Sequence, residues 1–159
     1  MNAEELLSYL GHASVEPALD DYLTGAGIDG RPSKNENTVY VDSDDGKLTL
    51  TFQAYDVYKK ESLVLPKNEG KFIFQTATFK RGFQDAFPYG LGFDAAPDAV
   101  TDVLGQPGRA RKLPNGEQSI TYFHGGCLVV VRFSASGHGI DWLSVGVPNT
   151  YNKEQGVAD

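Results

Sequence analysis

The fold is decided by residues 119–133, which read SITYFHGGCLVVVRF. β-Branched and aromatic side chains dominate this stretch, and such side chains favour extended strands. Gly125 and Gly126 interrupt it, and paired glycines adopt the positive φ that a two-residue hairpin turn requires. The pattern therefore predicts a β-hairpin, with one strand over 119–124 and the second over 127–133.

A second hairpin, as long as Ile120–Phe133, is predicted over Val39–Phe52. Apolar and polar side chains alternate over 47–52, so one face of that strand is buried and the other meets water. The stretch Asp44-Asp45-Gly46 is a turn signal between its two strands. Each hairpin is expected to gain a third strand, over Phe72–Phe79 and over Ile140–Val147.

Short helices are predicted before each set of strands. Apolar residues within 3–10 recur at the i, i+3, i+4, i+7 spacing of one helix face. Pro17 and Pro97 each mark a first helical turn, where the missing N–H of proline is not needed. Gly105 ends the third helix, because glycine readily adopts the left-handed conformation that follows a helix. That helix is expected to bury the stripe Val100, Val103 and Leu104.

The remaining stretches are predicted to be connections. Charged residues, glycine and proline replace the alternating pattern over 59–70, 80–92 and 109–118. Trp142 is separated from Ile140 by one residue and is expected to share its buried strand face.

Together these elements predict an α+β fold, with one or two antiparallel sheets and short helices on one face. Residues 1–148 are expected to form a single domain. Leu7–Gly11 is similar to Thr101–Gly105, which suggests two divergent helix-plus-three-strand repeats. Chance recurrence of a short helix–hairpin pattern is the alternative to a duplication. The repeats cover 1–79 and 80–148, and a polar tail, expected to be mobile, covers 149–159.

The composition is that of a globular, acidic protein. The 159 residues are 40% hydrophobic and 22% charged, which excludes disorder over most of the chain. The 21 acidic and 14 basic residues give a formal net charge of −7 at pH 7. That balance argues against a nucleic-acid partner, which requires a basic face, and it permits a basic protein partner. The single cysteine excludes a disulfide framework and a cysteine-cluster metal site.

No targeting or membrane segment is expected. The first residues, MNAEELL, lack the basic start and the apolar run of a secretory signal. The longest apolar run, 127–131, has the length of a strand rather than of a membrane span. A cytoplasmic location without a membrane partner is therefore predicted, and a signal peptide removed before Met1 would change that prediction.

The sequence predicts no catalytic residue, no cofactor and no metal site. His12, His124 and His138 are not spaced as metal ligands. Cys127 lies in the most apolar strand without a basic neighbour, so it is expected to pack as a small buried side chain. The polar residues of 136–144 would allow a hydrolase triad, but no nucleophile-elbow motif accompanies them, and a polar hairpin turn explains them better.

Residues 87–107 carry a resemblance to a known class of proteins. They read FPYGLGF over 87–93 and VLGQP over 103–107. This arrangement resembles the LP-x-GL-x-F…V…LG-x-P core of small bacterial immunity proteins, which neutralise toxins of contact-dependent and type VI secretion systems. Phe87 stands where that motif has Leu. The helix-plus-three-strand unit also resembles the fold of beta-lactamase inhibitory protein and of small outer-membrane assembly lipoproteins, and the resemblance is closest over 72–147.

The resemblance implies a function in binding rather than in catalysis. An immunity protein would bind a cognate toxin and occlude its active site or substrate path. An envelope assembly or adaptor protein is the alternative that the lipoprotein fold implies. A small hydrolase is a second alternative, although no convergent set of titratable residues supports it.

Partner-binding residues are predicted from the placement of acidic side chains. One group gathers at the first hairpin tip, where a solvated turn or a calcium loop is the alternative, although the twelve-residue calcium pattern is absent. A second group lies near the end of the second helix, where negative charge opposes the helix dipole and suggests a binding role. The first group is Asp42, Asp44 and Asp45, and the second is Asp20 and Asp21.

Aromatic residues in predicted connections are the other candidates. Tyr55, Tyr58 and Tyr89 would offer rigid contact area to a partner. Covering the sheet edges and the ends of the core is the alternative role for these rings.

Overall fold

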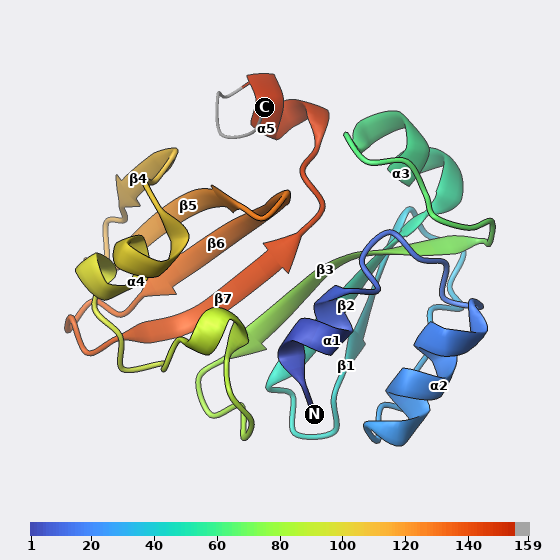
Figure 1. Ribbon diagram of the computed structural model, residues 1–159, viewed down its shortest axis with the longest axis horizontal. Coiled ribbons are helices and arrows are strands. Elements are labelled where there is room, and N and C mark those ends of the chain that lie inside the picture. Colours follow the sequence, from blue (N-terminus) through green and yellow to red (C-terminus); the bar gives the residue numbers. More distant parts are fainter. Residues whose placement is uncertain (155–159) are drawn as a thin grey trace.

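The computed structural model, which describes residues 1–154, contains one continuous antiparallel sheet. Its seven strands lie in the order β1-β2-β3-β7-β6-β5-β4 (Figure 1). The predicted α+β antiparallel fold is confirmed, with one sheet rather than two. The strands are β1 (Thr38–Asp42), β2 (Leu48–Ala54), β3 (Phe72–Lys80), β4 (Arg109–Lys112), β5 (Gln118–His124), β6 (Cys127–Phe133) and β7 (Ile140–Gly146).

Short helices accompany the sheet. Pro17 and Pro97 are the first residues of α2 and α4, as predicted, and Gly105 ends α4 with a φ of 93°. Within residues 1–154, none of these helices has the length and apolar character that a membrane crossing needs. They are α1 (Ala3–Leu7), α2 (Pro17–Gly25), α3 (Tyr55–Glu61), the 3-10 turn η1 (Pro88–Gly90), α4 (Pro97–Leu104) and α5 (Thr150–Glu154).

Two three-stranded meanders, β1-β2-β3 and β5-β6-β7, meet at the centre of the sheet. Their last strands pair antiparallel, with Ala77 opposite Val145 and Phe79 opposite Leu143. β4 adds a further strand at the free edge of β5. The pairing of β3 with β7 is what joins the two halves of the chain into one sheet.

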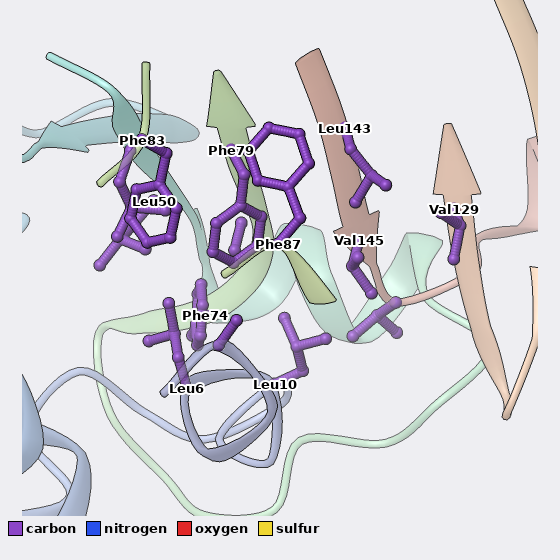
Figure 2. Close-up of a cluster of buried hydrophobic side chains, with 14 of the residues drawn as sticks. Leu6, Leu10, Leu50, Phe74, Phe79, Phe83, Phe87, Val129, Leu143 and Val145 are labelled. Carbon is purple, nitrogen blue, oxygen red and sulfur yellow. The ribbon is translucent and has the colours of Figure 1, made fainter. Parts of the chain in front are cut away.

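One face of the sheet carries the core. Buried side chains follow one another across the strands in the row Val41, Leu50, Ala77, Val145, Val129 and Tyr122. Leu6 of α1 and the following Leu10 lie on this face together with Phe74 (Figure 2). In the second half, α4 buries Val100 and Leu104. Both halves therefore contribute a helix to the same core.

Aromatic rings cover the seam between the halves. Phe79 is fully buried, and the connection between β3 and α4 brings Phe83 to 5.2 Å and Phe87 to 6.4 Å from it, centroid to centroid. Phe93 lies 5.9 Å from Phe87. Figure 2 shows Phe79, Phe83 and Phe87 gathered beside Leu50. This connection, predicted to be irregular, thus closes one end of the core.

Three predicted connections contain regular structure instead. The segment after β2 forms α3, which begins before the charged stretch 59–70. The polar stretch 109–118 contains β4, which pairs with β5. The predicted tail 149–159 forms α5 as far as Glu154, and its last residues, 155–159, lie outside the described part of the chain.

Trp142 lies on the open face of the sheet, so its predicted burial beside Ile140 is wrong. The pairing of β6 with β7 shifts between Arg132 and Phe133, because Arg132 faces Trp142 whereas Phe133 faces Ile140. Asp141 is therefore an extra residue, and such a bulge turns the following side chain to the other face. The Arg132 guanidinium lies 5.1 Å from the Trp142 ring centroid.

Candidate functional site

Acidic side chains from distant parts of the chain line two adjoining hollows around Met1. The hollows measure about 360 and 300 Å³, and both are lined by Met1 and Ala26. Figure 1 shows the N-terminus beside the turn that joins β1 and β2. None of the described residues that line these hollows is Lys or Arg. We call this region the acidic surface, and its carboxylates belong to Glu5, Asp21, Asp44, Asp45 and Asp85.

The turn between β1 and β2 positions the first two predicted aspartates. The Asp45 carboxylate accepts hydrogen bonds from the Lys47 N–H at 2.9 Å and from the Ser43 hydroxyl at 2.8 Å. These hydrogen bonds lower the pKa of the Asp45 carboxyl group, and the bond from the Lys47 N–H contributes most. Asp45 therefore holds the turn together in its ionised form. Asp44 is exposed beside it, and its carboxylate has no hydrogen bond to the residues described in the structure.

The start of the chain is fixed between α2 and the connection after β3. The Met1 ammonium group lies 3.1 Å from the Asp85 carboxylate. The Tyr22 hydroxyl donates a hydrogen bond to the carbonyl oxygen of Asn2 at 2.7 Å, and burial raises the pKa of Tyr22. Asp21, the neighbour of Tyr22, is exposed and lines the second hollow. These contacts place α1, α2 and the loop around Asp85 next to one another.

Two of the predicted aspartates do not join the acidic surface. Asp20 binds Arg31, whose Nε donates to the Asp20 carboxylate at 2.7 Å. Asp20 also lies in the first turn of α2, where the helix dipole favours negative charge, so the predicted conflict with the dipole at a helix end is wrong. Asp42 accepts a hydrogen bond from the Thr49 hydroxyl at 2.5 Å. Both carboxylates are thus engaged within their own local structure.

The three predicted tyrosines lie elsewhere, and Tyr58 is not accessible to a partner. Tyr58 of α3 is fully buried, and that burial raises its pKa to about 12. Tyr55, at the start of α3, is half-buried and lines a separate hollow together with Lys71. Tyr89 packs its ring edge-to-face on His124 at 5.1 Å, and burial raises its pKa to about 12. Tyr58 therefore belongs to the core, the role that the sequence left as the alternative.

Sequence reasoning missed two members of the acidic surface. Glu5 lies in the first turn of α1, where the helix dipole alone explains its charge. Asp85 lies in the irregular connection after β3, and no motif marks it. Only the fold brings both next to Asp21 and Asp44, so no local signal predicts the cluster.

A second charged site lies on the open face of the sheet, opposite the core. Its pocket measures about 330 Å³ and is formed by β4, β5, β6, β7 and α5. Its walls combine guanidinium groups with aromatic and hydroxyl side chains. The lining includes Arg109, Arg111, Arg132, Trp142, Tyr151 and Asn152. The sequence does not predict the basic pocket, because 109–118 has the composition of a loop and the position of Trp142 two residues after Ile140 favours burial.

The titratable residues of the described chain do not converge on a recognisable reaction centre. Among residues 1–154, no group of three or more His, Cys, Asp and Glu side chains is arranged to hold a metal ion. Cys127 is half-buried, and its burial raises the thiol pKa, while Lys67 opposes this shift. Because the thiolate is the reactive form, Cys127 is a poor nucleophile at neutral pH.

Cys127 should therefore react slowly with iodoacetamide. At neutral pH we expect alkylation of the native protein to be at least about fivefold slower than alkylation of the urea-unfolded chain, because burial both shields the thiol and disfavours its thiolate. Mass spectrometry of timed samples measures both rates. Equal rates in the two states would contradict this account of Cys127.

The comparisons with known proteins identify no family for this chain. No protein-family model matches the sequence, and no curated protein matches it. Among solved structures, the chain is similar to a DUF4309 family protein, YjgB from Bacillus subtilis. The identity is 12%, the TM-score is 0.41, and the match covers 81% of this chain and 77% of that chain. A likeness at this level does not bear on function.

Proposed function

We propose that the protein is a non-enzymatic inhibitor of the immunity-protein type, which binds a basic toxin protein through the acidic surface. The observation that carries this proposal is the convergence of five carboxylates, from α1, α2, the β1–β2 turn and the connection after β3, on two adjoining hollows. The Met1 ammonium group balances one of the five, the Asp85 carboxylate, and no Lys or Arg among the residues that line the hollows balances the other four. Gathering like charges is unfavourable unless something of opposite charge binds there. A basic protein supplies that charge.

Electrostatic complementarity gives such a surface a functional advantage. Opposite charges on two proteins accelerate their encounter and suppress binding of wrong partners. A toxin that acts on nucleic acid is basic, and the formal charge of −7 on this chain extends the attraction over the whole molecule. We propose the cytoplasm as the compartment, and the lone cysteine, which forms no disulfide, is compatible with a reducing environment.

The first hollow is lined by apolar as well as acidic residues. Ile28, Leu48 and Phe83 lie in its lining with Asp44 and Asp45, but all three are buried, with at most 8% of their surface exposed. The accessible part of the acidic surface is therefore mainly polar, and such charged surface governs the association rate more than the final affinity.

Reversing the charge of Asp21 and Asp44 should weaken the complex. Both carboxylates are exposed and make no hydrogen bond or ion pair with the described side chains, those of residues 1–152, so Asp21→Lys with Asp44→Lys should leave the fold intact. The partner to test is the protein encoded by the neighbouring gene, as immunity proteins are expected to lie beside their toxins. We expect the dissociation constant to rise at least about tenfold at about 50 mM salt, mainly through slower association.

The matched control is the pair Glu61→Lys with Asp102→Lys. These exposed helical carboxylates lie outside both hollows, and their reversal changes the net charge by the same amount. Surface plasmon resonance at about 50 and 300 mM salt measures the rates for all variants. If the control weakens binding as much as the test pair does, only the net charge matters, and the proposed surface is wrong. If the neighbouring protein does not bind at all, the immunity function is wrong.

A further inference from the structure

The basic pocket on the open face combines features of a small-ligand site. Arg109 and Arg111 lie two residues apart on β4, so both side chains reach the same sheet face. Across the sheet, Ser119 of β5 faces Arg111 on one side and Arg132 of β6 on the other. The register thus aligns three guanidinium groups along one end of the open face, and α5 adds Tyr151 to the pocket lining.

The described side chains of this pocket do not balance its positive charges. Glu117 binds Arg132, with 3.0 Å between the carboxylate and Nη1. The Nε atom of Arg132 is buried and has no hydrogen-bond partner in the described part of the chain. Neither Arg109 nor Arg111 forms an ion pair or a side-chain hydrogen bond with the side chains described, those of residues 1–152. Among these described side chains, three arginines and one carboxylate therefore leave two positive charges in the pocket.

The surroundings of the arginines mix apolar and polar side chains. The lining includes Leu128, Val130 and Trp142, and the hydroxyl groups of Ser119 and Thr121. At about 330 Å³, the pocket lies within the usual size range of small-molecule sites. Such a site suits a ligand with a doubly charged head and an apolar body.

We propose that this pocket binds a small organic phosphate monoester. A phosphate monoester carries about −1.5 to −2 charges near pH 7, which matches the two unbalanced positive charges. Guanidinium groups bind phosphate oxygens through paired, charge-assisted hydrogen bonds, and the free donors of Arg109, Arg111 and Arg132 supply these. The apolar side chains of the lining, Trp142 among them, contact the organic part of the ligand. This site is independent of the acidic surface, which lies on other elements.

The pocket carries its own spectroscopic probe, because Trp142 is the single tryptophan of the chain. Binding beside Trp142 and its stacked partner Arg132 should change the tryptophan emission. We would titrate the full chain with phenyl phosphate and with inorganic phosphate, and with benzoate, which has the same ring and one charge. Potassium chloride at matched ionic strength controls for general salt effects. We expect a saturable change with phenyl phosphate, a weaker one with inorganic phosphate, and the weakest with benzoate.

The variant Arg111→Gln tests the assignment to this pocket. Arg111 is exposed and unpaired in the described chain, so its replacement should not alter folding, and it removes one charge-assisted contact. We expect the dissociation constant for phenyl phosphate to rise about tenfold or more. The matched control is Lys60→Gln, which removes one positive charge from the exposed surface of α3.

The outcomes separate clearly. Weaker phenyl phosphate binding in Arg111→Gln, with wild-type binding in Lys60→Gln, supports the site. The proposal is overturned if no saturable change occurs up to about 10 mM ligand, if benzoate binds as tightly as phenyl phosphate, or if both variants bind equally. Binding of Arg111→Gln to the basic toxin should equal that of the wild type, so the failure of one proposal leaves the other standing.

Discussion

Replacing Phe79 with alanine should lower the free energy of unfolding by about 3–5 kcal/mol. Phe79 is fully buried where β3 meets β7, facing Leu48 on one side and Leu143 on the other. Its ring also packs on Phe83 and Phe87. Removing it opens a cavity in the part of the core that both halves share, and urea unfolding followed by circular dichroism measures the loss.

The matched control for Phe79→Ala is Val103→Ala. The sequence predicts Val103 in the buried stripe of α4, but the structure leaves 43% of its surface exposed. We therefore expect a change below about 0.5 kcal/mol. Because the halves share one core, Phe79→Ala should also keep a single cooperative transition. Two separate transitions, or equal losses in the two variants, would contradict the shared core.

Replacing Gly139 with alanine should destabilise the protein by about 3 kcal/mol or more. Gly139 has a φ of 100°, which side chains rarely adopt, and a Cβ atom there would overlap the Phe93 carbonyl oxygen and lie 2.7 Å from the Cα atom of Asp94. The adjacent Ile140 N–H donates to the same Phe93 carbonyl at 2.6 Å. The substitution would force the connection before α4 away from the start of β7.

Gly137→Ala separates backbone strain from this close approach. Gly137 also has a positive φ, 74°, but no atom lies within 4 Å of the Cβ position. Gly137→Ala should therefore lower the free energy of unfolding by only about 1 kcal/mol, the cost of the left-handed conformation. Thermal unfolding of both variants against the wild type measures the difference. Equal losses would mean that the 93–94 backbone does not pack against Gly139.

The hairpins and the fold class follow from the sequence, because their signals are local. Gly125 and Gly126 both adopt positive φ, and His124 pairs with Cys127 across the predicted two-residue turn. The turn near Gly46 is longer than the Asp-Gly signal suggests, since β1 ends at Asp42 and β2 begins at Leu48. Local propensity predicts that a turn forms but not its length.

The errors arise where tertiary contacts decide. The charges of α3 suggest a connection, yet the burial of Tyr58 stabilises a helix there. β4 is short and polar, and only pairing with β5 makes it a strand. A single bulge at Asp141 moves Trp142 to the open face. Alternation of side chains along the sequence does not reveal such a bulge.

The candidate sites, like the fold, depend partly on local signals and partly on tertiary contacts. Asp44 and Asp45 follow from their turn, and their surface is completed by Glu5, Asp21 and Asp85 only after folding. The basic pocket depends entirely on strand register, which no pattern in the sequence predicts. Charge can thus be counted from a sequence, whereas its distribution between two faces requires the structure.

The most direct test of the central claim is amide hydrogen exchange of the protein with and without the product of the neighbouring gene. Binding through the acidic surface predicts slower exchange in the turn between β1 and β2, in α1, and in the connection around Asp85. Protection confined to β4 and β5 on the open face, with exchange at the β1–β2 turn unchanged, would contradict it.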